Sequence, residues 1–438
     1  MLSQAKGRQT SDFHDFQAII FSGFGNGLYP LTETNNLPKA LLPLANKPMI
    51  WYVLKWCEEG GFLSVIVICQ MEVELCLSSY LKNVYDGHIK IQVYAPSSVD
   101  EALGTADVLR KVQDKIKSDF IVLSCDLVTN LPPHEILDFH RIHSPTVTSL
   151  LYDISKNESF VFSKDSGCEN KKVGRKMFFG ISKPDNALVC VKSAVDVDEE
   201  FVVRTSMLWK YPRIYVTSTF RDSHLYIFKR WVLDLIVQNE RISSIQEDLI
   251  PLLVKCQYQS LLLKRHNIKE IILRYTHTCS FVLDSTNEKL VRVITYLLPD
   301  NRYCMRSNTV ETYTDLNRNL SKISTETRIS TSAKVAQKAI IGIDSLVGEN
   351  TKIDERCNVK KSVIGANCIL GKSVTVINSI VMDNVKIEDG VRLDGCIVCI
   401  NSIIGSKSKL KNCCISGGYE VPSETCAKND NLIIFDGI

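Results

Sequence analysis

The chain has 438 residues, enough for two or three domains, and its 45% hydrophobic and 23% charged residues are typical of a globular protein. Its net charge of +3 is too small to indicate a nucleic-acid-binding or membrane-binding protein. Residues 1–15 are polar, so we expect a flexible N-terminus without a signal peptide, and no apolar run is long enough to span a bilayer.

Residues 17–150 alternate short apolar runs with amphipathic segments. The expected strands are 18–22, 65–69, 89–94, 120–125 and 146–152. The expected helices are 48–59, 73–81, 106–116 and 132–143. Strands that are apolar throughout are typical of a parallel sheet covered on both faces. The alternation predicts βαβ units with a ligand crevice at the carboxyl ends of the strands.

The first expected strand leads into a loop that contains Gly23, Gly25 and Gly27, and Lys39 follows further along the chain. Glycines permit positive φ angles and allow backbone N–H groups to approach a phosphate, to which a lysine adds a point charge. The loop is therefore either a phosphate-binding loop or a plain turn, and the glycines alone leave both interpretations open.

The surrounding residues resemble the signature of the sugar-nucleotide pyrophosphorylases, Gly-Gly-x-Gly-Thr-Arg-Leu-x-Pro-Leu-Thr followed by Pro-Lys-x-Leu-x-Pro. The matching positions are Gly23, Gly25, Leu28, Pro30, Leu31, Thr32, Pro38, Lys39, Leu41 and Pro43. Ser22, Asn26 and Gly27 depart from it. Gly27 stands where the family has an arginine that stabilises charge on the transferring phosphates, so the resemblance implies a nucleotidyltransferase loop without that chemistry.

Two further stretches resemble the same family. Residues 103–107 are similar to its Leu-Gly-Thr-Ala segment, which the resemblance implies would touch a nucleotide base. Asp126 follows Cys125 at the end of an expected strand and is similar to the family's magnesium-binding aspartate, although such an aspartate is also a common cap or turn residue. The family's second magnesium segment, Trp-x-Asp-x-Gly-Thr, has its nearest match at residues 281–286, without the Trp or the Gly. Two-metal phosphoryl transfer needs both carboxylates.

Residues 153–320 are less regular, with a strand expected around 213–228 and a helix at 229–237. Asp222 and His224 could form a catalytic pair, but we favour a structural pair on one strand face because no third member is evident. Residues 222–226 and 247–251 resemble marks of one branch of the family. The stretches expected to be loops or a polar linker are 157–172, 193–200 and 303–322.

After residue 329 an apolar residue recurs at every sixth position, with small phase shifts. The expected inward residues are Val335, Ile341, Val347, Ile353, Val359, Ile364, Leu370, Val376, Met382, Ile387, Leu393, Cys399, Ile404 and Leu410. A six-residue period predicts a parallel β-helix, and by resemblance the left-handed kind. We expect the pattern to fade after Leu410, which leaves a tail too short for a helical domain.

The cysteines bear on both the redox state of the chain and the presence of a metal site. Sixteen of them are scattered through apolar segments, which favours reduced, buried thiols and a cytosolic protein. Cys396 and Cys399 form a Cys-x-x-Cys motif close to Cys413 and Cys414. A zinc site needs four convergent ligands, so we favour core thiols and expect no metal site.

The expected fold is thus α/β, a nucleotidyltransferase-like (Rossmann-like) mixed sheet domain followed by a left-handed β-helix. The expected boundaries are 1–15 for the N-terminus, 16–320 and 330–425 for the two domains, and 426–438 for a tail.

One interpretation of the function is an active sugar-1-phosphate nucleotidyltransferase of the mannose-1-phosphate guanylyltransferase type. In it, Lys39 would contact the phosphates and Asp126 would hold magnesium.

The other interpretation is a non-catalytic relative. Most of residues 15–425 resemble the gamma-subunit family of eukaryotic translation initiation factor 2B. The resemblance implies a subunit of the guanine-nucleotide exchange factor for the GTPase initiation factor two, paired chiefly with the catalytic epsilon subunit. It implies no cofactor, no catalytic residues and no direct contact with nucleic acid or membrane. Gly23, Gly25, Lys39 and Asp126 would then mark a vestigial nucleotide pocket. We favour this interpretation.

Overall fold

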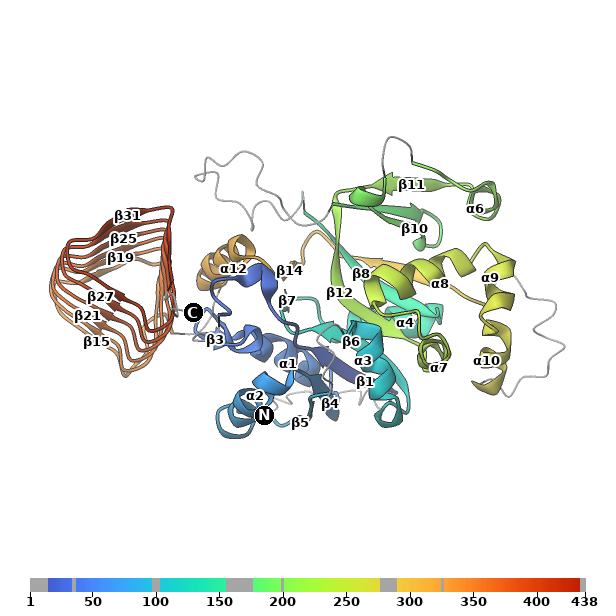
Figure 1. Cartoon of the computed structure of the whole chain (residues 1–438), viewed down its shortest axis with the longest axis horizontal. Coiled ribbons are helices and arrows are strands. Elements are labelled where there is room, and N and C mark those ends of the chain that lie inside the picture. Colours follow the sequence, from blue (N-terminus) through green and yellow to red (C-terminus); the bar gives the residue numbers. More distant parts are fainter. Residues whose placement is uncertain are drawn as a thin grey trace, which may run out of the picture. The chain divides into compact units, whose positions relative to one another are not determined.

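The computed structural model describes residues 15–33, 37–96, 103–154, 176–197, 201–275, 290–323 and 327–433. The chain forms two compact units (Figure 1). The sheet unit contains the described residues of 1–22, 53–158 and 164–304. The β-helix unit contains those of 23–52 and 305–438. The glycine loop therefore belongs to the same compact unit as the C-terminal β-helix.

A ten-stranded mixed sheet forms the centre of the sheet unit, in the order β11-β9-β10-β13-β8-β12-β6-β1-β4-β5. Four of its strands are parallel neighbours, namely β1 (Phe16–Phe21), β4 (Ser64–Ile68), β5 (Lys90–Tyr94) and β6 (Asp119–Ser124). The others are β8 (Val147–Asp153), β9 (Met177–Ser182), β10 (Ala187–Ser193), β11 (Ile214–Thr217), β12 (Phe220–Phe228) and β13 (Val293–Leu297). Because β12 runs antiparallel to both β6 and β8, the sheet is mixed, as expected.

Strand β1 lies between β4 and β6, and Ile20 is paired with Val67 on one side and Leu123 on the other. The chain moves from β1 to β4 and β5 on one side, then returns to β6 on the other. Such a reversal of strand order is where ligands bind in open α/β sheets, outside the carboxyl ends of the strands. A ligand site is therefore expected at the carboxyl ends of β1 and β6.

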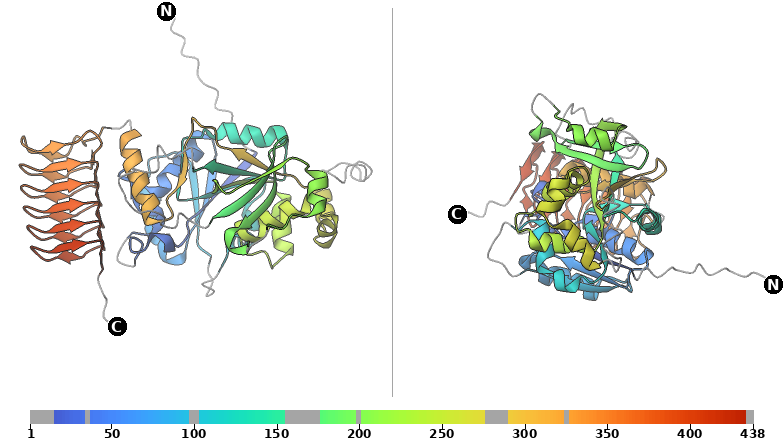
Figure 2. Two further views of the ribbon diagram at one scale, coloured as in Figure 1. Left: turned by 90° about the horizontal axis from the view of Figure 1, so that it is seen from above. Right: turned by 90° about the vertical axis from the view of Figure 1, so that its right-hand side faces the viewer.

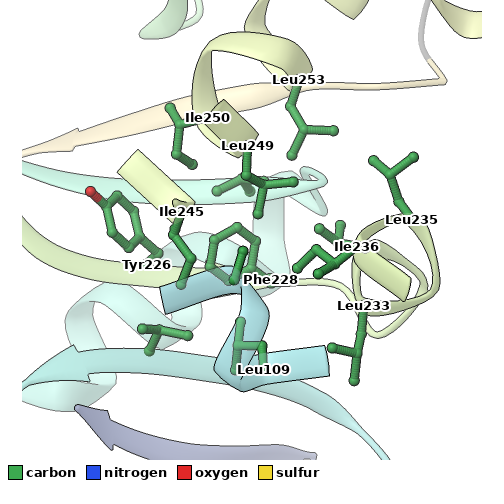
Figure 3. Packing of buried hydrophobic residues seen from close by; sticks show 14 of the residues in the cluster. Leu109, Tyr226, Phe228, Leu233, Leu235, Ile236, Ile245, Leu249, Ile250 and Leu253 are labelled. Carbon is green, nitrogen blue, oxygen red and sulfur yellow. The ribbon is translucent and has the colours of Figure 1, made fainter. Parts of the chain in front are cut away.

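The helices of the sheet unit are α2 (Met71–Asn83), α3 (Thr105–Lys111), α4 (Pro133–His143), α6 (Thr205–Lys210), α7 (Trp231–Gln238), α8 (Ile250–Cys256), α9 (Ser260–Arg265) and α10 (Ile268–Tyr275). Helix α1 (Met49–Glu59) runs from one unit into the other. A large apolar core packs α3, α7 and α8 against the sheet (Figure 3). Leu109, Phe228, Ile236 and Leu249 point into it. None of the described helices is long and apolar enough to cross a membrane.

Three six-stranded parallel sheets form the β-helix (Figures 1 and 2). The first contains β15 (Lys334–Val335), β18 (Lys352–Ile353), β21 (Ile369–Leu370), β24 (Lys386–Ile387), β27 (Ile403–Ile404) and β30 (Glu420–Val421). The second contains β16 (Ile340–Ile341), β19 (Asn358–Lys360), β22 (Thr375–Ile377), β25 (Arg392–Asp394), β28 (Lys409–Lys411) and β31 (Cys426–Lys428). The third contains β17 (Leu346–Val347), β20 (Val363–Ile364), β23 (Ile380–Val381), β26 (Ile397–Val398), β29 (Cys414–Ile415) and β32 (Asn431–Leu432).

Two details of the repeat differ from expectation. In the third sheet Ile364 pairs with Val381 and Val381 with Val398, so the strict six-residue step to Met382 and Cys399 is wrong by one residue. Successive inward residues are five positions apart where the chain passes from the second sheet to the third, as from Val376 to Val381. They are six positions apart at the other two corners of each coil. Val381 and Val398 lie in the interior cluster, and Met382 and Cys399 are buried outside it.

The C-terminal end also differs. The repeat continues beyond Leu410 with Ile415 and Val421 in the interior cluster. Strands β31 and β32 extend the ladder into the stretch expected to be a tail. In the last coil the inward positions include Tyr419 and Ala427, which are only partly buried. Because neither is a large aliphatic residue, the sequence pattern did not predict this coil.

The expected polar linker at 303–322 is wrong, because this stretch contains β14 (Cys304–Arg306) and helix α12 (Val310–Ile323). The helix buries Tyr313, Leu316 and Leu320, a single apolar stripe within a polar sequence. It packs on the third sheet of the β-helix. Four outward residues of that sheet are apolar and buried, namely Leu346, Val363, Ile380 and Ile397.

Candidate functional site

Local packing explains the glycines of the N-terminal loop one at a time. Gly25 has a φ of 79° and precedes the short 3₁₀ turn Asn26–Leu28. A Cβ atom on Gly25 would lie 3.0 Å from Thr32 Cγ2 and 3.1 Å from Lys39 Cβ, so this position needs glycine for both conformation and space. Gly23 has open space around it, so packing does not require glycine there.

Lys39, the expected phosphate-binding lysine, is only 5% exposed. Its Nζ donates a hydrogen bond of 2.7 Å to Oδ1 of Asn308, an exposed residue shortly before α12. A carbonyl oxygen of the chain thus accepts from the ammonium group that, by resemblance, would contact a phosphate oxygen. No sequence motif indicates this contact, because 269 positions separate the two residues.

Gly27 faces the backbone of the same asparagine. A Cβ atom at position 27 would lie 2.3 Å from the carbonyl oxygen of Asn308. Any side chain at this position, the family's arginine included, would overlap that backbone carbonyl. Asn308 therefore contacts the loop at two of its characteristic positions, Gly27 through its main chain and Lys39 through its side chain.

The rest of the loop segment is bound to α12 and the β-helix. β2 (Pro43–Leu44) and β3 (Lys47–Pro48) form a tight hairpin, with Pro43 on its first strand and Ala45 in its turn. The Tyr313 hydroxyl donates to the Pro43 carbonyl at 2.7 Å, and the Ala45 N–H donates to Asn317 Oδ1 at 2.8 Å. Two further bonds reach the coils, from Asn46 Nδ2 to the Ile364 carbonyl at 2.9 Å and from Ser416 Oγ to Glu33 Oε2 at 2.9 Å. These contacts give the segment a structural function within the β-helix unit.

Asp126, the expected magnesium ligand, lies in the sheet unit directly after β6. It is buried, as is Cys125, whose N–H donates to the Phe21 carbonyl at 3.0 Å and so joins the ends of β6 and β1. Within the described ranges, no three His, Cys, Asp or Glu residues are arranged to hold a metal ion. Residues 281–286, the nearest match to the second magnesium segment, lie outside the described residues.

The Leu-Gly-Thr-Ala segment is bonded to another part of the sheet unit. The Ser243 carbonyl accepts from the Ala106 N–H at 2.8 Å, and a Cβ atom on Gly104 would lie 2.2 Å from the same oxygen. Thr105 Oγ1 accepts from the Ile245 N–H at 2.9 Å. The groups that the resemblance assigns to a nucleotide base thus bind residues 243–245.

Asp107 completes this arrangement. Its Oδ2 accepts from Ser243 Oγ at 2.6 Å and from the Gly104 N–H at 3.1 Å, and Arg110 forms an ion pair with it at 2.6 Å. Burial acts to raise the pKa of the carboxyl, but the hydrogen bonds from Ser243, Arg110 and Gly104 outweigh it and hold the pKa below its usual value. The Arg110 guanidinium also donates to the carbonyls of Ile236, Asn239 and Ile242. These contacts favour a structural function for this ion pair.

Asp222 and His224 do not share a regular strand face, so that expectation is wrong. The pairing of β12 with β8 shifts register between Asp222 and Tyr226, and His224 has a φ of 56°. Asp222 Oδ1 accepts from the His224 backbone N–H at 2.9 Å, and its other oxygen accepts from the Tyr226 hydroxyl. These bonds hold a bulge, which supports a structural interpretation.

Most cysteines of the β-helix are buried, whereas Cys414 is partly exposed and Cys426 is exposed. Cys396 and Cys413 lie in the interior cluster, and Cys399 is also buried. Burial raises the pKa of the Cys396 thiol to about 12 and raises that of Cys399 as well. Thiols in such surroundings are poor metal ligands and poor nucleophiles, because both activities need the thiolate.

Two family models match the chain. "Nucleotidyl transferase" matches residues 17–269, and "EIF2B subunit epsilon LbH domain" matches residues 321–425. The chain is 40% identical over 424 residues to translation initiation factor eIF2B subunit gamma of Schizosaccharomyces pombe, which covers 97% of this chain and 91% of the relative. It is 28% identical over 392 residues to the Dictyostelium discoideum eIF2B subunit gamma, which covers 82% and 84%. A mannose-1-phosphate guanyltransferase of Candida albicans is 31% identical over 133 residues, or 30% of this chain and 35% of that enzyme.

Proposed function

Because this chain belongs to the eIF2B gamma-subunit family, we propose that it is a non-catalytic subunit of the guanine-nucleotide exchange factor for initiation factor two. In this proposal it pairs with the catalytic epsilon subunit and promotes exchange of GDP for GTP on the GTPase, in the cytosol. The expected partners are proteins, the other subunits of the complex and the GTPase itself. No nucleotidyl transfer takes place on this chain.

The observation that carries the proposal is the contact between Gly27 and Asn308. The Asn308 carbonyl oxygen lies 2.3 Å from the place that a Cβ atom at position 27 would take, so this backbone has no space for an arginine. Losing one preorganised donor to a transition-state charge costs on the order of 10²–10³ in rate. Lys39, which would have to contact the phosphates, is already hydrogen-bonded to Asn308.

The alternative, an active guanylyltransferase, is supported by the retention of Lys39 and Asp126 and by the partial similarity to mannose-1-phosphate guanyltransferase. The two functions differ in a simple assay of pyrophosphate release from GTP, ATP or UTP with a panel of sugar 1-phosphates. We expect no release above background. Turnover on the order of 1 s⁻¹, ordinary for an enzyme, would establish the alternative.

Exchange is tested by the release of labelled GDP from initiation factor two. An exchange factor must bind the nucleotide-free state of the GTPase best. We expect this chain alone to leave the release rate near its uncatalysed value. Added to the epsilon subunit, it should increase both the exchange rate and the apparent affinity for the GTPase. Substantial exchange by this chain alone, or no increase on mixing, would contradict the proposal.

Gly23, Gly25, Lys39 and Asp126 remain our proposed vestigial nucleotide pocket, with Asn308 in the place of a phosphate at Lys39. Removal of the Asn308 side chain should then take away one acceptor that competes with a phosphate for the Lys39 ammonium group. We expect millimolar GTP to raise the melting temperature of an Asn308→Ala variant through binding linkage, and to leave the wild-type value unchanged. If GTP stabilises neither protein, the loop serves only as architecture.

A further inference from the structure

One face of the β-helix carries an unusual arrangement of positive charge. In the second sheet, the outward residues of β25, β28 and β31 include four exposed cations, Arg392, Lys409, Lys411 and Lys428, which we call the basic face. Between them Leu393, Leu410 and Ala427 point inward, as the alternation of a strand requires. The cations therefore lie together on a flat surface formed by three consecutive coils.

The cations of the basic face are stacked in register. Arg392 lies directly opposite Lys409, and Lys411 lies directly opposite Lys428. Neighbouring strands are about 4.8 Å apart, and like charges directly opposite each other destabilise a sheet. One carboxylate interrupts the face: Asp394 Oδ2 lies 3.7 Å from Lys411 Nζ. Burial lowers the pKa of Arg318 on α12, and the carboxylates of Asp315 and Asp394 oppose this shift. With four cations and one carboxylate, the face stays positive.

The first sheet of the same β-helix shows a different pattern. Its outward row begins with one stacked pair of cations, Lys334 and Lys352. After this pair Ile369, Lys386, Ile403 and Glu420 follow, so no further cations are stacked along the row. Lys386 Nζ also lies 3.9 Å from Glu388 Oε1. The first sheet thus has a single stacked pair at its N-terminal end, and its Lys386 lies between apolar residues. The basic face differs because it places two stacked pairs side by side on three consecutive coils.

We propose that the basic face binds an extended acidic segment of a partner protein. Lys409 and Lys411 lie two residues apart on one parallel strand, a spacing of about 6.6 Å. Carboxylates at alternate positions of an extended peptide have the same spacing, so two rows of charge can match. The ligand's negative charge also relieves the repulsion between the stacked pairs.

The composition of the face favours protein over nucleic acid. Three of its four cations are lysines, which act as point charges, whereas arginine is the residue suited to bidentate phosphate contacts. None of the outward residues of β19, β22, β25, β28 and β31 is aromatic, so the face offers no side chain on which a base can stack. The net charge of the whole chain, +3, is also low for a nucleic-acid-binding protein.

The test uses the full chain and a fluorescein-labelled ten-residue peptide of alternating Glu and Ser, with binding measured by fluorescence anisotropy at 50 mM salt. We expect saturable binding that weakens at 300 mM salt. The double variant Lys409→Gln/Lys428→Gln should lose at least about tenfold in affinity, while its melting temperature stays the same or rises because stacked charges have been removed.

The matched control is Lys360→Gln/Lys386→Gln, which removes the same charge from positions with apolar cross-strand neighbours, Ile377 for Lys360 and Ile369 and Ile403 for Lys386. We expect this control to bind within twofold of wild type. Equal losses in the two variants would show a nonspecific charge effect and overturn the proposal, as would a failure of the wild type to bind the peptide. Tighter binding of a ten-nucleotide oligouridylate through the same two lysines would overturn it in favour of nucleic acid.

Discussion

The β-helix and the loop segment at residues 23–48 are stabilised in different ways. In the β-helix each interior residue packs against its counterparts in the adjacent coils, so the repeat itself supplies the contacts. The loop segment instead depends on Asn308, Tyr313 and Asn317, which lie far along the chain. The chemistry of such a segment depends on the distant residues that contact it as well as on its own residues. Retention of the loop residues is therefore weak evidence for retention of catalysis.

The largest effect is expected where the repeat is broken. Leu370 is 0% exposed and lies in the interior cluster, so Leu370→Asp would bury an unpaired carboxylate and remove apolar contacts with both neighbouring coils. We expect a loss of at least about 4 kcal/mol of folding free energy, seen as loss of soluble protein or a large fall in the urea midpoint.

The control lies one residue away on the same strand. Ile369 points outward and is 47% exposed, so Ile369→Asp should change the urea midpoint little. If the two variants behave alike, the contacts of the β-helix are not determined by the inward positions of its repeat, and the contrast with the loop segment no longer holds.

The second prediction concerns the loop. Gly27→Ala would place a Cβ atom 2.3 Å from the Asn308 carbonyl oxygen, so the segment before α12 must move. We expect a loss of about 2 kcal/mol, typical of overpacking. Because the overlapping atom belongs to the main chain, adding Asn308→Ala should not restore stability.

The control is Gly23→Ala, at a position with open space. Its free energy of unfolding should lie within about 0.5 kcal/mol of the wild-type value in the same urea titration. Equal losses at positions 23 and 27 would remove the steric argument against an arginine.

The sequence was informative wherever a contact is local or periodic. The βαβ alternation predicts β1, β4, β5 and β6, and the hexapeptide period predicts Ile353 and Leu370 as interior residues, which the structure confirms. Helix α12 was missed because only three apolar residues form its buried stripe, and its partner, the apolar outward face of the third sheet, is a tertiary feature. The shift from Met382 to Val381 arises from one five-residue step that a strict period does not include.

The candidate site was predictable in part. The replacement of an arginine by Gly27 is visible in the sequence, but the reason that glycine is required there is Asn308, which no motif connects to it. Ser243, which binds the Leu-Gly-Thr-Ala segment, was missed for the same reason. A single sequence shows which residues a loop retains. It does not show which distant residues contact them.

The two units should also respond in opposite ways to acid. In the β-helix unit, burial raises the pKa of Asp315 to about 6, against the opposing effect of Arg318. The folded state therefore binds this proton between about pH 6 and the unfolded value of 3.8, and acid stabilises the fold in that window. In the sheet unit His140 has the reverse effect. It is 3% exposed, its Nδ1 lies 2.8 Å from Thr148 Oγ1, and burial with the nearby Lys229 lowers its pKa to about 3.

The smallest predicted effect follows from His140. Between pH 6.5 and about pH 3 the unfolded chain binds a proton that the folded chain excludes, so stability falls as the pH falls. The loss is at most about 1.4 kcal/mol per pH unit, or about 2 kcal/mol at pH 5. In urea titrations at pH 7 and pH 5, His140→Leu should lack this loss, whereas Asp315→Asn should show a larger one, because it lacks the compensating proton. Should His140→Leu remain as acid-sensitive as wild type, protonation of the buried imidazole does not limit the sheet unit, and its acid response arises from other groups.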